Sequence, residues 1–173
     1  MSGSRIKIAR DALILFIRSL PEGCDFSVIS FGTNFASLDD NRPFMTYDNE
    51  SKTSAINAIE KFTADFGGTK ILEPLQAAQT SAAYDSGKKK RIFCLTDGQV
   101  SNSSQVIQAA REHRDQTRVY TFGLGSGCDK NLVTQVATAG RGSHTLVDDR
   151  AADLNAQVIR ALTEAMQPSL KDA

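Results

Sequence analysis

A carboxylate stands at the end of an apolar run in the stretch RIFCLTDGQVSN, residues 91–102. Residues 91–96 have the length and composition of a buried strand, and Asp97 and Gly98 follow them directly. A strand that enters a core seldom ends on a charge, so Asp97 is a candidate functional residue. The alternative is an ordinary turn, because Asp-Gly is also a common turn pair.

A hydroxyl is the second candidate, in the loop that contains Gly67, Gly68 and Thr69. Glycines permit unusual backbone angles, so Thr69 is expected to expose its hydroxyl where a helix begins. The alternative is that Thr69 caps that helix. If Thr69 and Asp97 converge, their oxygens suit a hard cation such as Mg²⁺, which prefers oxygen ligands and keeps several waters.

The hydrophobic pattern predicts the elements that must position these residues. Apolar residues at three- and four-residue steps predict helices over 4–20, 51–64, 70–85, 129–139 and 150–166, with one more starting near Asn102 or Ser103. β-Branched and aromatic runs predict strands over 24–32, 91–96, 118–125 and 143–147, a short edge strand over 34–38, and a polar loop over 39–50.

The alternation of strands and helices predicts the fold class. It is typical of an α/β protein with a doubly wound, mostly parallel sheet and helices on both faces. Ligands of such folds bind beyond the carboxyl ends of the strands. Asp97 lies at one such end, as do Gly32 and Gly123. The expected functional edge of the sheet therefore includes Asp97.

Length and charge exclude several classes of partner. The 173 residues predict one domain over 1–167 and a short tail over 168–173. Lys plus Arg and Asp plus Glu both number 20, so nothing favours nucleic acid or an anionic membrane surface. Residues 88–91 form a basic run, for which we expect a solvated approach to a strand. No apolar stretch nears the ~18 residues of a membrane span.

The cysteines indicate a reducing compartment, and we expect a cytoplasmic protein. Cys24, Cys94 and Cys128 cannot all pair, and their spacing matches no zinc pattern. Cys94 could act as a nucleophile with His113 or His144 as its base. Cys94 lies mid-strand, however, where a thiol is normally buried and inert. A nucleotide site at residues 123–127 is disfavoured because the stretch is not Gly-x-Gly-x-x-Gly.

Four stretches resemble the von Willebrand factor type A domain, in particular the kind that follows a VIT (vault/inter-alpha-trypsin) domain. They are SGSRIKIARDALILFIRSLPEGCDFSVISFG, FGGTKILEPL, RIFCLTDGQVSN and RVYTFGLGSG, in that order along the chain. The resemblance implies a metal-ion-dependent adhesion site, built from an Asp-x-Ser-x-Ser loop, a Thr and an Asp. Thr69 matches the Thr and Asp97 matches the last Asp.

The same resemblance implies a function without catalysis. The domain would be a protein-protein interaction module whose Mg²⁺ binds a carboxylate of a protein partner. Gly67, Gly68 and Gly98 would form the rim around the ion. The alternatives are a metal-independent structural module of a larger intracellular assembly and a Cys-dependent enzyme. Partner capture that survives EDTA would favour the metal-independent module. Loss of turnover in Cys94→Ala would favour the Cys-dependent enzyme.

The sequence departs from the family at its beginning, where the first strand and the Asp-x-Ser-x-Ser loop are missing. Ser2 and Ser4 resemble a remnant of that loop but fit better as a cap of the first helix. The family's strand order is 3-2-1-4-5-6, so a missing first strand would separate strand 24–32 from strand 91–96. We expect a truncated version of a longer protein, with weak or absent Mg²⁺ binding.

Overall fold

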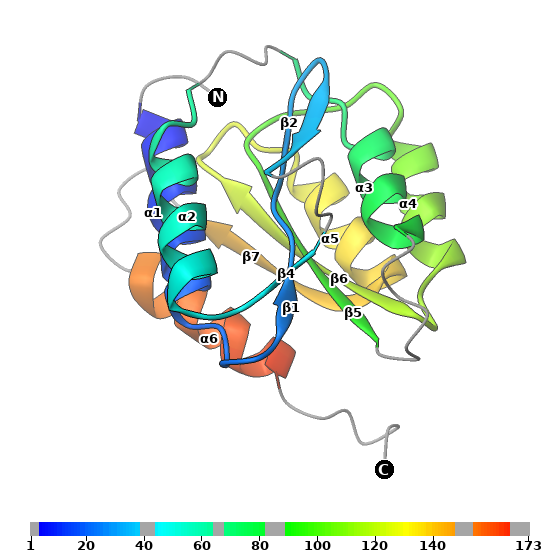
Figure 1. Cartoon of the computed structure of the whole chain (residues 1–173). Helices are drawn as coiled ribbons and strands as arrows, with labels where there is room; N and C mark the ends of the chain where they lie inside the picture. The colour runs from blue at the N-terminus through cyan, green and yellow to red at the C-terminus, as the bar shows by residue number, and fades with distance from the viewer. Residues whose placement is uncertain (1–3, 39–43, 64–67, 82–88, 148–153, 167–173) are drawn as a thin grey trace.

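The computed structural model describes five stretches of the chain, whose helices and strands are arranged as Figure 1 shows. The described residues are 4–38, 44–63, 68–81, 89–147 and 154–166. The expected tail over 168–173 lies outside them.

A parallel sheet of three strands carries the carboxyl-terminal half of the fold. Its order is β5 (Lys90–Thr96), β6 (Thr117–Leu124) and β7 (Arg141–Val147). Seven of the eight residues of β6 are buried, because β6 has a strand on each side and helices over both faces. This parallel sheet confirms the expected fold class.

Helices cover both faces of this sheet (Figure 1). They are α1 (Ser4–Arg18) and α6 (Leu154–Met166) on one face, and α4 (Ser103–Glu112) and α5 (Lys130–Ala139) on the other. On the first face, Phe16 of α1 and Val158 of α6 share a core with Phe122 of β6. On the second, Val106 of α4 and Val136 of α5 share a core with Val119.

A third core lies on the far side of α1, beneath α2 (Asn49–Glu60). Ile17 of α1 packs there with Phe26 and with Ile59 of α2. α2 begins two residues earlier than expected, because Asp48 caps it. The Asp48 carboxylate accepts from the Ser51 backbone N–H at 2.8 Å, and Ser51 Oγ accepts from the Asp48 backbone N–H at 2.9 Å.

The predicted strand over 24–32 is wrong as a single element. The structure divides it into β1 (Asp25–Phe26) and β2 (Ile29–Phe31). β1 pairs antiparallel with β4 (Met45–Thr46), which lies inside the expected loop, and β2 pairs antiparallel with β3 (Phe35–Ser37). The run divides because its two halves pair with different partners, while the short edge strand over 34–38 is confirmed as β3.

The helix expected over 70–85 is shorter, as α3 (Leu72–Thr80). Pro74 lies in its first turn, where a missing backbone N–H costs no helical hydrogen bond. Ser81 ends the helix with an extended ψ of 127°. The last residues of the expected helix, 82–85, lie outside the described residues.

β2 and β5 are not hydrogen-bonded to each other. Among the described strands, β5 pairs with β6 alone and β2 pairs with β3 alone. Each of these two strands therefore has one edge that no described strand pairs. The absence of pairing between β2 and β5 agrees with the expected separation of strands 24–32 and 91–96, while the missing first strand itself stays a prediction.

Candidate functional site

The site is built around the carboxyl end of β5. This strand ends at the buried Thr96, and the half-buried Asp97 and Gly98 follow it. The Thr96 hydroxyl accepts from the Gly98 backbone N–H at 3.3 Å, which turns the chain immediately after the strand. Asp97 is thereby held at the edge of the sheet where ligands bind in this class of fold.

The loop that carries Thr69 is tied to the loop after β2. Lys70 donates its backbone N–H to the Gly32 carbonyl at 2.9 Å. Gly68 has a φ of +73°, which favours glycine, and a Cβ placed on it would lie 3.2 Å from the Thr33 hydroxyl oxygen. The 68–70 loop therefore packs directly against residues 32–33.

The structure brings Thr69 to the Asp97–Gly98 turn. A Cβ placed on Gly98 would collide with the Thr69 hydroxyl oxygen and lie 3.1 Å from its Cβ and its Cγ2. Only glycine permits this approach, so Gly98 has a steric role as well as a place in the turn. The two candidate ligands, Thr69 and Asp97, consequently come from different loops to one rim.

The other predicted rim and ligand residues are not all placed. Ser2 and Gly67 lie outside the described residues, and Ser4 is the first residue of α1 with its side chain outside them too. Gly68 and Gly98 are both at the rim. Thr33 is a rim residue that the sequence analysis missed. The signal was present in Gly32-Thr33, which follows a strand just as Asp97-Gly98 does.

The donor set at this rim suits a hard cation in kind but is small in number. Thr69 offers a hydroxyl oxygen and Asp97 a carboxylate oxygen, which are ligand types that Mg²⁺ accepts. The described residues contain no group of three or more His, Cys, Asp or Glu side chains that could hold a metal. Within the described residues, these two side chains therefore supply only part of a full set of ligands.

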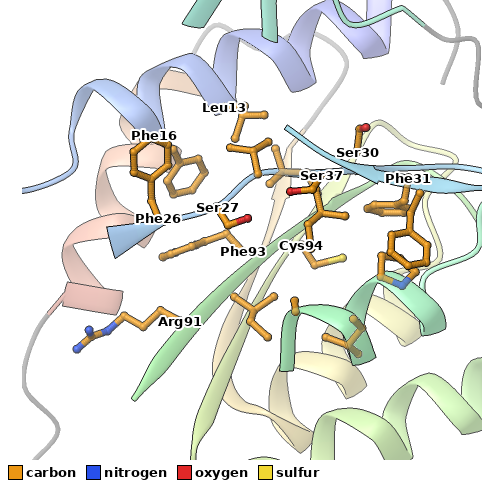
Figure 2. A pocket seen from close by; sticks show the side chains of 18 of the residues that line it. Leu13, Phe16, Phe26, Ser27, Ser30, Phe31, Ser37, Arg91, Phe93 and Cys94 are labelled. Carbon is orange, nitrogen blue, oxygen red and sulfur yellow. The ribbon is translucent and has the colours of Figure 1, made fainter. Parts of the chain in front are cut away.

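A cavity of about 860 Å³ opens from the rim into the molecule. Thr69 and Asp97 line one end of it, and Arg91, at the start of β5, lines the other. Between them, side chains of α1, β2, α3 and β5 form its walls, several of which Figure 2 shows as sticks. The cavity occupies the gap between the edges of β2 and β5.

Cys94 lines this cavity (Figure 2) and is half-buried, so it is less enclosed than is usual for a residue in the middle of a strand. No described strand pairs with the edge of β5 that lies away from β6, and the Cys94 side chain is partly exposed. Burial among apolar groups nevertheless raises the pKa of the Cys94 thiol to about 12. A thiol with that pKa is neutral at physiological pH, unlike an activated nucleophile.

The sheet register separates Cys94 from its candidate base His144. Cys94 is opposite Thr121 of β6, and Thr121 is opposite His144 of β7. Two strand spacings of about 4.8 Å therefore separate Cys94 from the exposed His144. The other candidate, His113, is half-buried and caps the carboxyl end of α4. The structure does not assemble a Cys–His pair from Cys94 and His144.

Lys90 corrects the expectation of a solvated basic run. Its side chain is only 8% exposed, and its ammonium donates to the carbonyls of Ala78 at 3.1 Å and Gln79 at 2.8 Å. Burial lowers the pKa of Lys90. The last carbonyls of α3 lack helical partners, which is why a cation is accommodated there. Lys89 and Arg91 are exposed, and Lys88 lies outside the described residues.

Sequence comparison identifies the family. The family model of the von Willebrand factor type A domain matches residues 1–145. A von Willebrand factor A domain-containing protein of Dictyostelium discoideum is 33% identical over 172 residues, which are 99% of this chain and 20% of that protein. The human von Willebrand factor A domain-containing protein 5B1 is 34% identical over 172 residues, 99% of this chain and 14% of that protein. The chain thus spans a fifth or less of these relatives.

Solved structures agree on the fold. A von Willebrand factor type A protein from Catenulispora acidiphila has a TM-score of 0.81 at 19% identity, over 94% of this chain and 38% of that one. Proximal thread matrix protein 1 from the mussel byssus, with zinc in its MIDAS motif, has a TM-score of 0.69 at 18% identity. The match covers 90% of this chain and 40% of that one. None of the described helices is long and apolar enough to cross a membrane. By its sequence match and its fold, the chain belongs to the von Willebrand factor type A domain family.

Proposed function

We propose that this chain is a non-catalytic protein-interaction module that binds a carboxylate of a protein partner through Mg²⁺ at the rim. The observation that carries the proposal is the close approach of Thr69 to Gly98, directly beside Asp97. The mussel byssus protein, which has the same fold, holds zinc at its MIDAS motif. A hydroxyl and a carboxylate at the carboxyl end of β5 support a cation site here.

In this proposal Thr69 and Asp97 would hold the ion, and Gly67, Gly68 and Gly98 would leave room for the partner. The ion supplies the positive charge that a partner carboxylate needs, and no covalent bond changes. Because only two protein side chains would hold the ion, we expect the 173 residues alone to bind Mg²⁺ weakly or negligibly. An Asp-x-Ser-x-Ser loop after a first strand, as in domains that follow a VIT domain, would supply the remaining ligands.

Thermal melting in the presence and absence of millimolar Mg²⁺ tests the metal site. The chain is compared with a form extended at its N-terminus by a strand and an Asp-x-Ser-x-Ser loop. Mg²⁺ should raise the melting temperature of the extended form only, since binding to the native state stabilises it. Asp97→Ala should abolish the shift, while Asp11→Ala, an exposed carboxylate on α1, should retain it. A shift that survives Asp97→Ala would contradict the site.

One observation favours a second candidate, a metal-independent structural module of a larger intracellular assembly. The described residues contain no group of three or more His, Cys, Asp or Glu side chains that could hold a metal ion. Capture of a protein partner that is unchanged by EDTA would support this candidate over the first. For both we propose a reducing, cytoplasmic setting, supported by Cys24, Cys94 and Cys128, none of which forms a disulfide in the described part of the chain.

A further inference from the structure

A hollow of about 310 Å³ lies between the carboxyl-terminal parts of α4 and α5. Six residues line it: Ile107, Arg111 and Arg114 from α4 and the turn after it, and Gln135, Thr138 and Ala139 from α5. None of them lines the cavity beside Asp97. The hollow is therefore separate from the site described above.

The charge of the hollow comes from Arg111 and Arg114, which both line it. Arg111 is in the last turn of α4, and Arg114 follows the helix and donates its backbone N–H to the Arg111 carbonyl at 3.4 Å. The His113 carbonyl fixes the rest of this turn, because it accepts the backbone N–H of Gln116 at 3.0 Å and that of Thr117 at 2.8 Å. One firmly held turn of backbone consequently presents both guanidinium groups.

Neither of these two guanidinium groups has a hydrogen bond or an ion pair with another residue in the part of the chain that the structure describes. The acidic residues beside them in sequence have other contacts: Asp115 pairs with Arg141 at 2.7 Å, and Glu112 accepts from Gln108 Nε2 at 3.1 Å. Like charges three residues apart at the end of a helix repel each other. An anion between them would replace this repulsion by attraction to both.

α5 adds a neutral wall with one further donor. Gln135 Nε2 donates one of its two N–H groups to Asn131 Oδ1 at 2.8 Å, which leaves the second for a ligand. No acidic residue occurs in α5, and none lines the hollow. A bound anion would therefore meet two positive side chains and no negative one.

The carboxyl ends of α4 and α5 reduce this attraction without cancelling it. Each helix end is equivalent to about half a negative charge, so both ends together offset at most about one of the two guanidinium charges. Backbone donors reduce the effect further: the Arg111 carbonyl accepts from Arg114, and the Val136 carbonyl accepts the Gly140 N–H at 2.9 Å. The hollow consequently remains attractive to an anion.

We propose that the hollow between α4 and α5 binds the phosphate group of a phosphothreonine in a protein partner, with Arg111 and Arg114 as its ligands. A phosphate monoester carries a charge of about −1.5 to −2 at pH 7 and three acceptor oxygens. Two arginine forks match that charge and those oxygens, whereas a carboxylate carries only one charge. The half-buried Ile107 and the buried Ala139 supply apolar surface for the threonine methyl. This second protein-binding site is independent of the proposed Mg²⁺ site.

Amide chemical shifts in a phosphopeptide titration test the site. The probe is acetyl-Gly-Ala-Ala-phosphothreonine-Ala-Ala-Gly-amide, in which the phosphate is the only charged group, added to the 173-residue chain in EDTA. We expect saturable shifts at residues 107–115 and 135–140. Peptides with unmodified threonine or with glutamate at the central position should bind about tenfold more weakly or less, because they lose charge-assisted hydrogen bonds. Since no metal is present, failure here leaves the Mg²⁺ proposal untouched.

Matched variants separate the hollow from general positive charge. Arg111→Gln and Arg114→Gln should each weaken phosphopeptide binding about tenfold, the loss of one charge-assisted contact. Arg111→Lys keeps the charge but lacks the fork of a guanidinium, so its affinity should lie between those of Arg111→Gln and the wild type. Arg160→Gln removes an exposed arginine of α6, on the opposite face of the sheet (Figure 1), and should bind normally. Circular dichroism of each variant confirms that the helices remain folded.

Titration with inorganic phosphate distinguishes a protein ligand from the free ion. The phosphopeptide should bind about fourfold more tightly, because the threonine methyl gains contact with apolar surface. Equal affinity would assign the hollow to the free ion and would overturn the assignment to a protein partner. Three further results would overturn the proposal: equal binding of the unmodified or glutamate peptide, unchanged affinity of Arg111→Gln and Arg114→Gln, and shifts confined to other surfaces.

Discussion

At the scale of single residues, the rim depends on the lack of a side chain at Gly98. Gly98 lets Thr69 approach the turn that carries Asp97, since a Cβ at position 98 would collide with the Thr69 hydroxyl. The metal proposal and the steric observation therefore concern the same pair of loops. Changes at Gly98 and Thr69 are expected to be coupled, because the two residues touch.

Gly98→Ala should lower the free energy of unfolding by about 1–3 kcal/mol, the usual cost of forcing extra volume into a packed site. Thr69→Ala in the Gly98→Ala background should restore part of the loss, because it removes the hydroxyl and the methyl that the new Cβ would meet. Urea unfolding of the two single variants and the double variant measures the coupling. Purely additive effects would show that the two loops do not meet in solution.

Cys94 gives a second prediction at this scale, on reactivity. Burial raises its pKa from 9.0 to about 12, so its thiolate at pH 8 is roughly a thousandfold scarcer than in the unfolded chain. Iodoacetamide should therefore modify Cys94 far more slowly in the native chain than in urea, as peptide mass mapping would show. Equal rates would indicate an activated thiol and would favour the Cys-dependent enzyme.

The raised Cys94 pKa also has a consequence for stability. Between pH 9 and 12 the unfolded chain loses the thiol proton while the native chain keeps it. Native stability should consequently fall as the pH rises through this window. Cys94→Ala should remove that component of the pH dependence.

At the scale of elements, α3 is held at its carboxyl end by a residue of a neighbouring strand. Lys90, the first residue of β5, donates to the Ala78 and Gln79 carbonyls, and to the Ser81 carbonyl at 3.3 Å. Residues of α3 and of β5 both line the cavity of about 860 Å³. Lys90 therefore fixes the distance between two walls of this cavity.

Lys90→Met should lower the free energy of unfolding by about 2 kcal/mol, because buried carbonyls lose a charged donor. Burial lowers the native Lys90 pKa from its ordinary 10.5. Just below pH 10.5 the unfolded chain therefore binds the Lys90 proton more tightly than the native chain does. The free energy of unfolding of the wild type consequently has a component that rises with pH. Lys90→Met should lose this component, whereas Lys7→Met, an exposed lysine of α1, should keep it. Denaturant unfolding from pH 8 to 10.5 compares the three proteins, and identical profiles would contradict the interpretation.

At the scale of the whole molecule, the fold has a continuous half and a divided half. β5, β6 and β7 form one parallel ladder between helices, whereas β1 to β4 form two separate antiparallel pairs of two or three residues per strand. Two-stranded pairs are marginal alone. The stability of the molecule is therefore expected to differ between these halves.

Native-state hydrogen exchange tests this difference. Amides of β6 should exchange only through global unfolding, because β6 is buried and paired on both edges. Amides of β1 to β4 should exchange about a hundredfold faster or more, through smaller openings. Uniform exchange would mean that the two halves unfold as one unit.

Local sequence patterns predicted much of this architecture, and the predictions that were wrong share one cause. Periodicity predicted α1, α5, β5 and β6 to within a few residues, because their apolar positions repeat at the helical or strand spacing. The run over 24–32 was predicted as one strand, since composition alone does not show that its halves pair with different partners. Lys90 was placed in solvent because its acceptors, Ala78 and Gln79, come from another element.

The sequence by itself determined the order and type of the main elements, the family, and the identity of Thr69 and Asp97 as candidate ligands. These depend on residue type and spacing, which are local properties. Only the tertiary structure decided that Thr69 meets the Asp97–Gly98 turn, and that β2 and β5 enclose an apolar cavity. Contacts between residues distant in sequence depend on how packed elements place their loops and edges, so these two features became visible only in the folded chain.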